Sequence, residues 1–405
     1  AGAWCGQNKY LSAIKNAFQN FMPLTIAGAI GVLWCNVLVN DQTGLGLFFK
    51  PIMALDFLNP AFQAVNFCTI SCITVGITLG IAQEIGVWNM GAERAGYIPG
   101  LVGLAAWLSV TNTSHMVEGA KEAFTGIAGN ELGATGLFTG MIIGVLSVEL
   151  FCFFEKQDAL KIKMPEQVPP GVARAFEVLV PATITLIITA CIGSACYNLT
   201  GLYLNDVIKN GIQGPLGAVG ATIPGVMIIY LVIMLFWLVG IHGNNMLSAV
   251  KEALFTPLAL ENVEKFNKGE KPTNIINMYF LQMCGEFGGS GVTIGLVIAI
   301  MIFGKREDNK AIASLSLVPG LFNINETVTF GIPMVLNPIL GIPFVFACLV
   351  TILVGYVLTV IGFCPVACLT VPWTTPPIVF GFLACGANVM GAVTQAILIV
   401  VSTVI

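Results

Sequence analysis

Long apolar runs recur along the first 239 residues of this chain, and each is close to the length of one membrane crossing. The runs lie at about 21–39, 62–82, 96–112, 134–154, 178–199 and 219–239. A helix needs about 20 apolar residues to cross the hydrocarbon core of a bilayer. Only 9% of the 405 residues are charged and 56% are hydrophobic, whereas a soluble domain carries about 25% charged residues. The pattern therefore predicts an all-α polytopic protein embedded in the lipid bilayer.

The loops between these runs predict an orientation. The segment 155–176 holds four basic residues, and basic loops stay in the cytoplasm. Single crossings counted back from it place the N-terminus in the cytoplasm as well, and the loops at 41–61 and 113–133 outside. The stretch 7–20 has apolar residues at helical spacing, which predicts an amphipathic surface helix or the start of the first span. Residues 202–213 read as a second surface helix.

Simple counting of spans fails after residue 240. The six crossings before it place residue 240 in the cytoplasm, and the basic stretch 304–310 belongs there too, so an even number of crossings must separate them. The only obvious span between them, 273–303, supplies one crossing and is interrupted by GEFGGSG. A similar break by Asn, Gly and Pro occurs within 313–340. Irregular backbone at membrane depth is tolerated only inside protein or beside a watery cavity. We therefore predict re-entrant hairpins around a substrate site in the C-terminal half.

Several kinds of chemistry have no support in the sequence. The chain has twelve cysteines but only two histidines, and the cysteines show no metal-binding spacing, so we predict no metal site. A phosphate-binding loop of the G-x-x-x-x-G-K-[ST] type is missing, so we do not expect ATP hydrolysis. The net charge of -4 is spread over loops and does not indicate binding to nucleic acid.

The stretch LFNINETVTFGIP, residues 321–333, places Asn323, Asn325 and Glu326 among apolar residues. A carboxylate inside a membrane is costly and therefore indicates a functional site. Amides both donate and accept hydrogen bonds and a carboxylate accepts several, which suits a ligand with many hydroxyl groups. The alternative is a hairpin tip near water in which the two amides only cap a helix.

Two further candidates follow from WLVGIHGNN, residues 237–245, and VPWTTPP, residues 371–377. His242 suits proton and charge transfer near neutral pH, and its glycine neighbours let backbone and ligand approach closely. The alternative is a histidine that is hydrogen-bonded at a helix end. Trp373 offers an aromatic platform for a sugar ring, and the alternative is a tryptophan of the interfacial belt.

Five motifs in a fixed order resemble the membrane IIC component of bacterial phosphotransferase-system (PTS) sugar transporters, in the lactose/cellobiose/N,N'-diacetylchitobiose group. They are GIHG at 240–243, GGSG at 288–291, FNINE at 322–326, FGIPMVLNPILGIPF at 330–344 and VPWTTPP at 371–377. The start of the chain, NKYLSAIKNAFQNFMPLTIAGAI, is also similar to that group. One departure is Thr327, where the family commonly has proline after NINE, and this change alters local rigidity.

The resemblance implies a homodimer with about ten transmembrane helices, located in the bacterial cytoplasmic (inner) membrane. Residues 1–200 would form a scaffold and dimerisation half with five spans, and residues 201–405 a substrate-binding half with re-entrant hairpins. The sugar would be phosphorylated by the phosphocysteine of a separate cytoplasmic IIB protein, so this chain needs no cofactor of its own. The resemblance makes the chain the membrane subunit of a sugar phosphotransferase, and it leaves open whether this subunit counts as an enzyme by itself.

The resemblance also assigns roles to residues. Glu326 would bind the sugar 6-hydroxyl and help to deprotonate it, with His242 beside the same hydroxyl. The remaining substrate-binding residues would be Asn323, Asn325, Gly243, Asn244 and Trp373. The expected function is a permease for a β-linked disaccharide, N,N'-diacetylchitobiose or cellobiose. The alternative is an ion-coupled secondary sugar transporter in which Glu326 and His242 form a proton site and the product is free sugar. A membrane scaffold or receptor would not explain the buried polar cluster.

Overall fold

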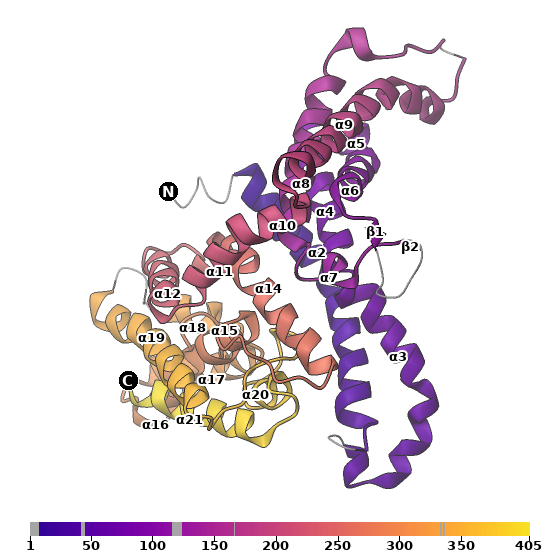
Figure 1. Ribbon diagram of the computed structural model, residues 1–405. Coiled ribbons are helices and arrows are strands. Elements are labelled where there is room, and N and C mark those ends of the chain that lie inside the picture. Colours follow the sequence, from indigo (N-terminus) through magenta and orange to yellow (C-terminus); the bar gives the residue numbers. More distant parts are fainter. Residues whose placement is uncertain (1–7, 42–44, 116–123, 166, 333, 335–336) are drawn as a thin grey trace. The chain divides into compact units, whose positions relative to one another are not determined.

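The computed structural model describes residues 8–41, 45–115, 124–165, 167–332, 334 and 337–405. These residues are mostly helical (Figure 1). The strands in this part of the chain are β1 (Ser114–His115) and β2 (Phe124–Thr125), which pair antiparallel. The predicted all-α membrane fold is therefore confirmed.

The chain divides into two compact units. The N-terminal unit comprises Gln7–Leu24 and Thr69–Pro215, and the C-terminal unit comprises Thr25–Cys68 and Leu216–Ile405. The segment Thr25–Cys68 thus groups with the C-terminal residues, although it comes early in the sequence. The roles expected for the two halves, scaffold and substrate binding, stay predictions.

The N-terminal unit holds the first part of α2 (Lys9–Leu33) and a set of helices that follow one another along the chain. These are α4 (Ile73–Met90), α5 (Ala92–Ala95), α6 (Ile98–Val110), α7 (Gly129–Leu132), α8 (Leu137–Glu155), η5 (Asp158–Leu160), α9 (Pro170–Thr200), α10 (Leu204–Ile208) and η6 (Lys209–Gln213).

The C-terminal unit holds the end of α2, a run of short helices, and the later helices of the chain. The early ones are η1 (Trp34–Leu38), η2 (Leu45–Leu47), η3 (Lys50–Leu58), α3 (Asn59–Asn66) and η4 (Phe67–Ser71). The later ones are α11 (Gly214–Gly220), α12 (Ile223–Leu238), α13 (Gly243–Met246), α14 (Ser248–Asn267), α15 (Met278–Gly285), α16 (Thr293–Phe303), α17 (Glu307–Leu321), α18 (Glu326–Gly331), α19 (Pro338–Val360), α20 (Val379–Ala384) and α21 (Val389–Val404).

Each of the six predicted apolar runs coincides with a helix or a helix pair. Among the described residues, four helices are long and apolar enough to cross a membrane, or up to five if the pair of helices at 50–90, bent by 42°, is one span. The helices α6, α12, α16 and α21 are shorter and also apolar. The stretch 7–20 was predicted as a surface helix or as the start of the first span. From Lys9 onward it is the start of α2, which continues into that span, as the second alternative has it.

Helix starts in the C-terminal unit are fixed by side-chain caps. Thr222 accepts a hydrogen bond from the Gly225 N–H at the start of α12. Asn277, Asn337 and Asn388 cap α15, α19 and α21 in the same way. Such caps satisfy backbone N–H groups that have no partner inside the helix. This requirement is strict in a membrane, where water is missing.

Small residues let α4, α6 and α8 pack closely in the N-terminal unit. A Cβ atom added at Gly103 would overlap the Cβ of Ala82, and one added at Gly140 would overlap the hydroxyl of Thr78. Between membrane helices the driving force is van der Waals packing, so small residues at the interface bring the backbones together. The core of this unit therefore depends on glycine at these positions.

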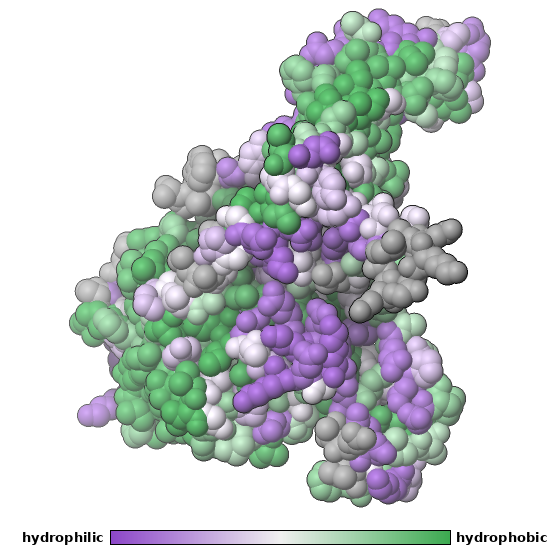
Figure 2. Space-filling model, viewed as in Figure 1, coloured by the Kyte–Doolittle hydropathy of each residue, from purple (hydrophilic) through white to green (hydrophobic). Residues whose placement is uncertain are grey.

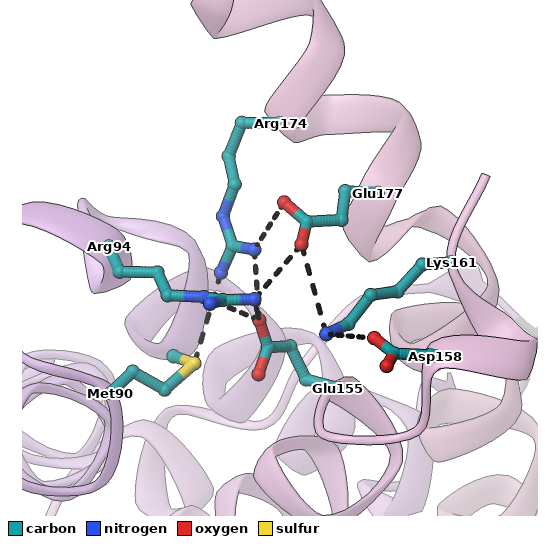
Figure 3. A network of polar contacts seen from close by, with 7 residues as sticks. All are labelled: Met90, Arg94, Glu155, Asp158, Lys161, Arg174 and Glu177. Atoms are coloured by element: carbon teal, nitrogen blue, oxygen red, sulfur yellow. Dashed lines mark hydrogen bonds and ion pairs between the residues drawn. The ribbon is translucent and has the colours of Figure 1, made fainter. Parts of the chain in front are cut away.

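A network of ion pairs lies where the C-terminal end of α8 meets the N-terminal end of α9 (Figure 3). The Glu155 side chain is only 3% exposed, and its Oε1 lies 2.8 Å from Arg94 Nη2 and 2.9 Å from Arg174 Nη1. Glu177 lies 2.9 Å from both arginines. Two guanidinium groups thus compensate a buried carboxylate, as burial of a charge requires. The network thus links the C-terminal end of α8 with α5 and with the first turns of α9.

Apolar side chains point outward from several helices. Figure 2 shows hydrophobic surface over α19, where Ile339 is 81% exposed and Phe346 is 56% exposed. On α12, Ile228 is 62% exposed. Large exposed apolar patches on a soluble protein would promote association, and here they suit contact with lipid.

We predict that Gly103→Ala lowers the thermal stability of the purified protein in detergent. The added methyl group has no space against Ala82, and overpacking costs about 1–3 kcal/mol. Gly171→Ala, at the start of α9, is the matched control because a Cβ atom there meets nothing within 4 Å. Equal melting temperatures for the two variants would contradict this account of the packing.

Candidate substrate site

Four non-helical or short helical segments of the C-terminal unit come together through hydrogen bonds. We call them the His loop (239–247), the Gly loop (286–292), the NINE loop (322–326) and the Trp loop (371–378). Asn323 joins the NINE loop to the Gly loop and the Trp loop, and Asn244 joins the His loop to the Gly loop. Four of the five motifs that carry the family resemblance therefore meet in one place.

His242 and Glu326 face each other in this site. The His242 Nε2 atom lies 3.7 Å from the Glu326 Oε1 atom, and the side chains are 36% and 47% exposed. His242 is the N-cap of α13 and Glu326 is the first residue of α18. A carboxylate at a helix N-terminus is favoured by the helix dipole. The two groups are accessible to a ligand.

The tautomer of His242 follows from its other hydrogen bond. Its Nδ1 atom accepts from the Asn245 N–H at 3.2 Å, so a neutral ring carries its proton on Nε2. Burial of the imidazole lowers the pKa of His242, while the Glu326 carboxylate acts in the opposite direction. The lowered pKa favours the neutral ring at pH 7, with the Nε2–H facing the carboxylate.

A hydroxyl group fits the chemistry of this pair. At 3.7 Å the two atoms are too far apart for a good direct hydrogen bond. A polar contact of this length often has a water molecule or a ligand group beside it. A hydroxyl can accept a hydrogen bond from the His242 Nε2–H and donate its own proton to Glu326.

The two NINE-loop amides both bind protein groups. The Asn323 Oδ1 atom accepts from the Gly288 N–H at 2.6 Å, and its Nδ2 donates to the carbonyl groups of Trp373 and Thr375. The Asn325 side chain is 3% exposed and donates to the Ser290 carbonyl at 2.8 Å. In this arrangement the two amides fasten the loops to one another. Their contact with a sugar stays a prediction.

The other predicted residues differ in their access to the site. A Cβ atom added at Gly243 would overlap the carbonyl oxygen of Ile233, so glycine is needed there for packing. Asn244 donates to the Ser290 hydroxyl at 2.8 Å. Trp373 is 44% exposed, which leaves its ring free to cover a ligand. Binding of a ligand by any of the three stays a prediction.

A buried ion pair behind the site was not predicted from the sequence. The Lys251 ammonium on α14 contacts the Glu286 carboxylate, and the Tyr230 hydroxyl donates to the same carboxylate at 2.7 Å. The Lys251 and Glu286 side chains are 8% and 16% exposed. An ionisable residue at membrane depth is a general signal of function. Lys251 was overlooked because it stands in a polar helix.

Among the residues that the structure describes, no group of three or more His, Cys, Asp or Glu side chains is placed to hold a metal ion.

Comparison with known proteins places the chain in a family. The family model described as "Phosphotransferase system, EIIC" matches residues 15–348. The chain belongs to this family and is therefore a membrane component of a phosphotransferase-system sugar permease. The resemblance read from the motifs is confirmed.

Relatives and a solved structure support this assignment over nearly the whole chain. The oligo-beta-mannoside-specific EIIC component of Bacillus subtilis is 34% identical over 403 residues, which cover 98% of this chain and 88% of that protein. The cellobiose-specific EIIC component of Lactococcus lactis is 29% identical over 459 residues, which cover 99% of this chain and 93% of that protein. The crystal structure of ChbC, the IIC component from the N,N'-diacetylchitobiose-specific phosphotransferase system, matches with a TM-score of 0.90 at 29% identity, over 99% of this chain and 93% of that chain.

We predict that Asn323→Gly lowers the stability of the protein and that Asn323→Ala lowers it further. Both changes leave the Gly288 N–H without its partner, which costs about 1–3 kcal/mol when such a group is buried. Asn323 has φ of 62°, a conformation that glycine adopts freely and alanine adopts at a cost of about 1–2 kcal/mol.

Thermal unfolding in detergent measures the three proteins side by side. We expect the highest melting temperature for the wild type, a lower one for Asn323→Gly and the lowest for Asn323→Ala. If both variants melt with the wild type, the amide does not hold the loops together.

Proposed function

We propose that this chain is a permease that binds a β-linked disaccharide, N,N'-diacetylchitobiose or cellobiose, and carries it inward across the bacterial cytoplasmic membrane. The sugar then presents its 6-hydroxyl for phosphorylation by a separate cytoplasmic IIB protein. The relatives named above are specific for oligo-beta-mannosides, cellobiose and N,N'-diacetylchitobiose, which supports a β-linked sugar as substrate. We further propose that the working unit is a homodimer.

The observation that carries this proposal is the pairing of His242 and Glu326 at 3.7 Å in an accessible position. The sugar 6-hydroxyl would lie between the two side chains. It would accept a hydrogen bond from the His242 Nε2–H and donate to the Glu326 carboxylate, which replaces the hydrogen bonds that the hydroxyl made in water. The exposed ring of Trp373 would cover the apolar face of a sugar ring.

Phosphoryl transfer then follows from this placement. The sugar oxygen attacks the phosphorus atom of the IIB phosphocysteine, a P–O bond forms, the P–S bond breaks, and the thiolate stays on IIB. The hydroxyl proton passes to Glu326, which is within reach of it as a general base must be. His242 keeps its Nε2–H toward the same oxygen. Positioning and electrostatics supply most of the catalysis in such a reaction.

We predict that Glu326→Gln and His242→Ala weaken binding of the disaccharide to the purified protein. A hydrogen bond to a charged group contributes about 1.5–3 kcal/mol, so the dissociation constant for Glu326→Gln should rise about 10-fold to 100-fold. Calorimetric dissociation constants for N,N'-diacetylchitobiose, cellobiose and lactose identify the sugar that the protein binds most tightly. Glu307→Gln is the matched control, because this carboxylate on α17 is 88% exposed.

If the Glu326→Gln variant binds the disaccharide as tightly as the wild type, the sugar does not bind at Glu326. The competing function, an ion-coupled secondary transporter with a proton site at Glu326 and His242, differs in its product. Proteoliposomes that deliver only free sugar in the presence of phosphorylated IIB would favour that function over this proposal.

A further inference from the structure

Lys251 is a buried charge that the proposed reaction does not use. Its side chain is 8% exposed, and its ammonium contacts two groups, the Glu286 carboxylate and the Asn244 Oδ1 atom, the latter at 3.2 Å. A buried ammonium is costly unless it is paired. Glu286 compensates the charge, and the bond to Asn244 extends the pair into the His loop, two residues after His242.

The ammonium fixes the orientation of the Asn244 amide. An ammonium donates hydrogen bonds and accepts none, so the Asn244 Oδ1 atom has to face Lys251. The Nδ2 of the same amide then faces the opposite way and donates to the Ser290 Oγ atom at 2.8 Å. Without Lys251, the amide could turn over, and the bond to Ser290 would have to form with the amide oxygen.

Ser290 links Asn244 of the His loop to Asn325, the residue before Glu326. The Ser290 side chain accepts from Asn244 on the His loop, while its carbonyl oxygen accepts from the Asn325 Nδ2 at 2.8 Å. Ser290 is 5% exposed and Asn325 is 3% exposed, so water does not compete well for either bond. One residue of the Gly loop is thus bonded both to Asn244, two residues after His242, and to Asn325, which directly precedes Glu326.

We infer that Lys251 is a positioning residue, which orients Asn244 and thereby holds the His loop and the NINE loop at the spacing that fits a hydroxyl between His242 and Glu326. This inference rests on the proposed function of that pair. The Lys251 side chain is 8% exposed and bonded to Glu286 and Asn244, so it would act on His242 and Glu326 through Asn244 and Ser290.

The test compares the affinity for the preferred disaccharide with that for its analogue that lacks the 6-hydroxyl. The wild type should bind the parent sugar about 10-fold to 100-fold more tightly than the 6-deoxy analogue, because the analogue cannot bond to the carboxylate. Lys251→Met should reduce this ratio to within about threefold of one, mainly by weakening the parent sugar. A purely structural role would weaken both sugars equally and leave the ratio unchanged.

Two further variants keep the test decisive if Lys251→Met does not fold. Ser290→Ala keeps the Lys251–Glu286 pair and removes only the hydroxyl that accepts from Asn244, and it should also reduce the ratio. Lys251→Met combined with Glu286→Gln removes both charges, so no unpaired carboxylate is left buried. Lys265→Met is the matched control, because Lys265 lies near the other end of α14 and donates to Thr273.

The outcomes separate the two proposals. If the wild type does not distinguish the parent sugar from the 6-deoxy analogue, the proposed function of His242 and Glu326 is wrong. If the wild type distinguishes them and the folded Lys251 and Ser290 variants keep the full ratio, the proposed function stands and the positioning role of Lys251 is wrong. A reduced ratio in these variants, with a normal ratio in Lys265→Met, supports the inference.

Discussion

The site depends on one constraint, namely that backbone groups away from water need hydrogen-bond partners. The segments that form the site are not regular helices, so side chains have to supply those partners. Asn323 binds backbone groups of the Gly loop and the Trp loop. Gln395 is fully buried; its Oε1 accepts from the N–H groups of Ile378 and Gly381, and its Nε2 donates to the Met283 carbonyl. These amides make an irregular, polar site possible inside an apolar protein.

Charge is handled in the same way, by pairing within the protein. Glu155 is held between two arginines in the N-terminal unit, and Glu286 is held by Lys251 and Tyr230 in the C-terminal unit. Glu326 is different, since its nearest ionisable partner is a histidine at 3.7 Å and its side chain is about half exposed. An acid that is not compensated by a fixed cation remains available to a ligand, and this contrast distinguishes Glu326 from the structural acids.

Much of the fold and part of the site could be predicted from the sequence. Apolar length is a direct consequence of bilayer thickness, so the spans from 21–39 to 219–239 were found where helices occur. Glu326 is a candidate because a carboxylate among apolar residues is costly, and His242 because a histidine suits proton transfer near neutral pH. Their roles stay predictions. The sequence could not show that the Asn323 and Asn325 amides bind backbone groups, since an amide that binds a loop and one that binds a sugar look alike in sequence. Lys251 and the grouping of Thr25–Cys68 with the later helices depend on contacts between distant segments, which no local pattern reports.

The most direct test of this account is a crystal or cryo-electron microscopy structure of the protein with its disaccharide bound. The account predicts that the 6-hydroxyl oxygen lies about 2.6–3.2 Å from both the Glu326 carboxylate and the His242 Nε2 atom. A bound sugar whose 6-hydroxyl lies far from both side chains, with another hydroxyl between them or none, would contradict the central claim.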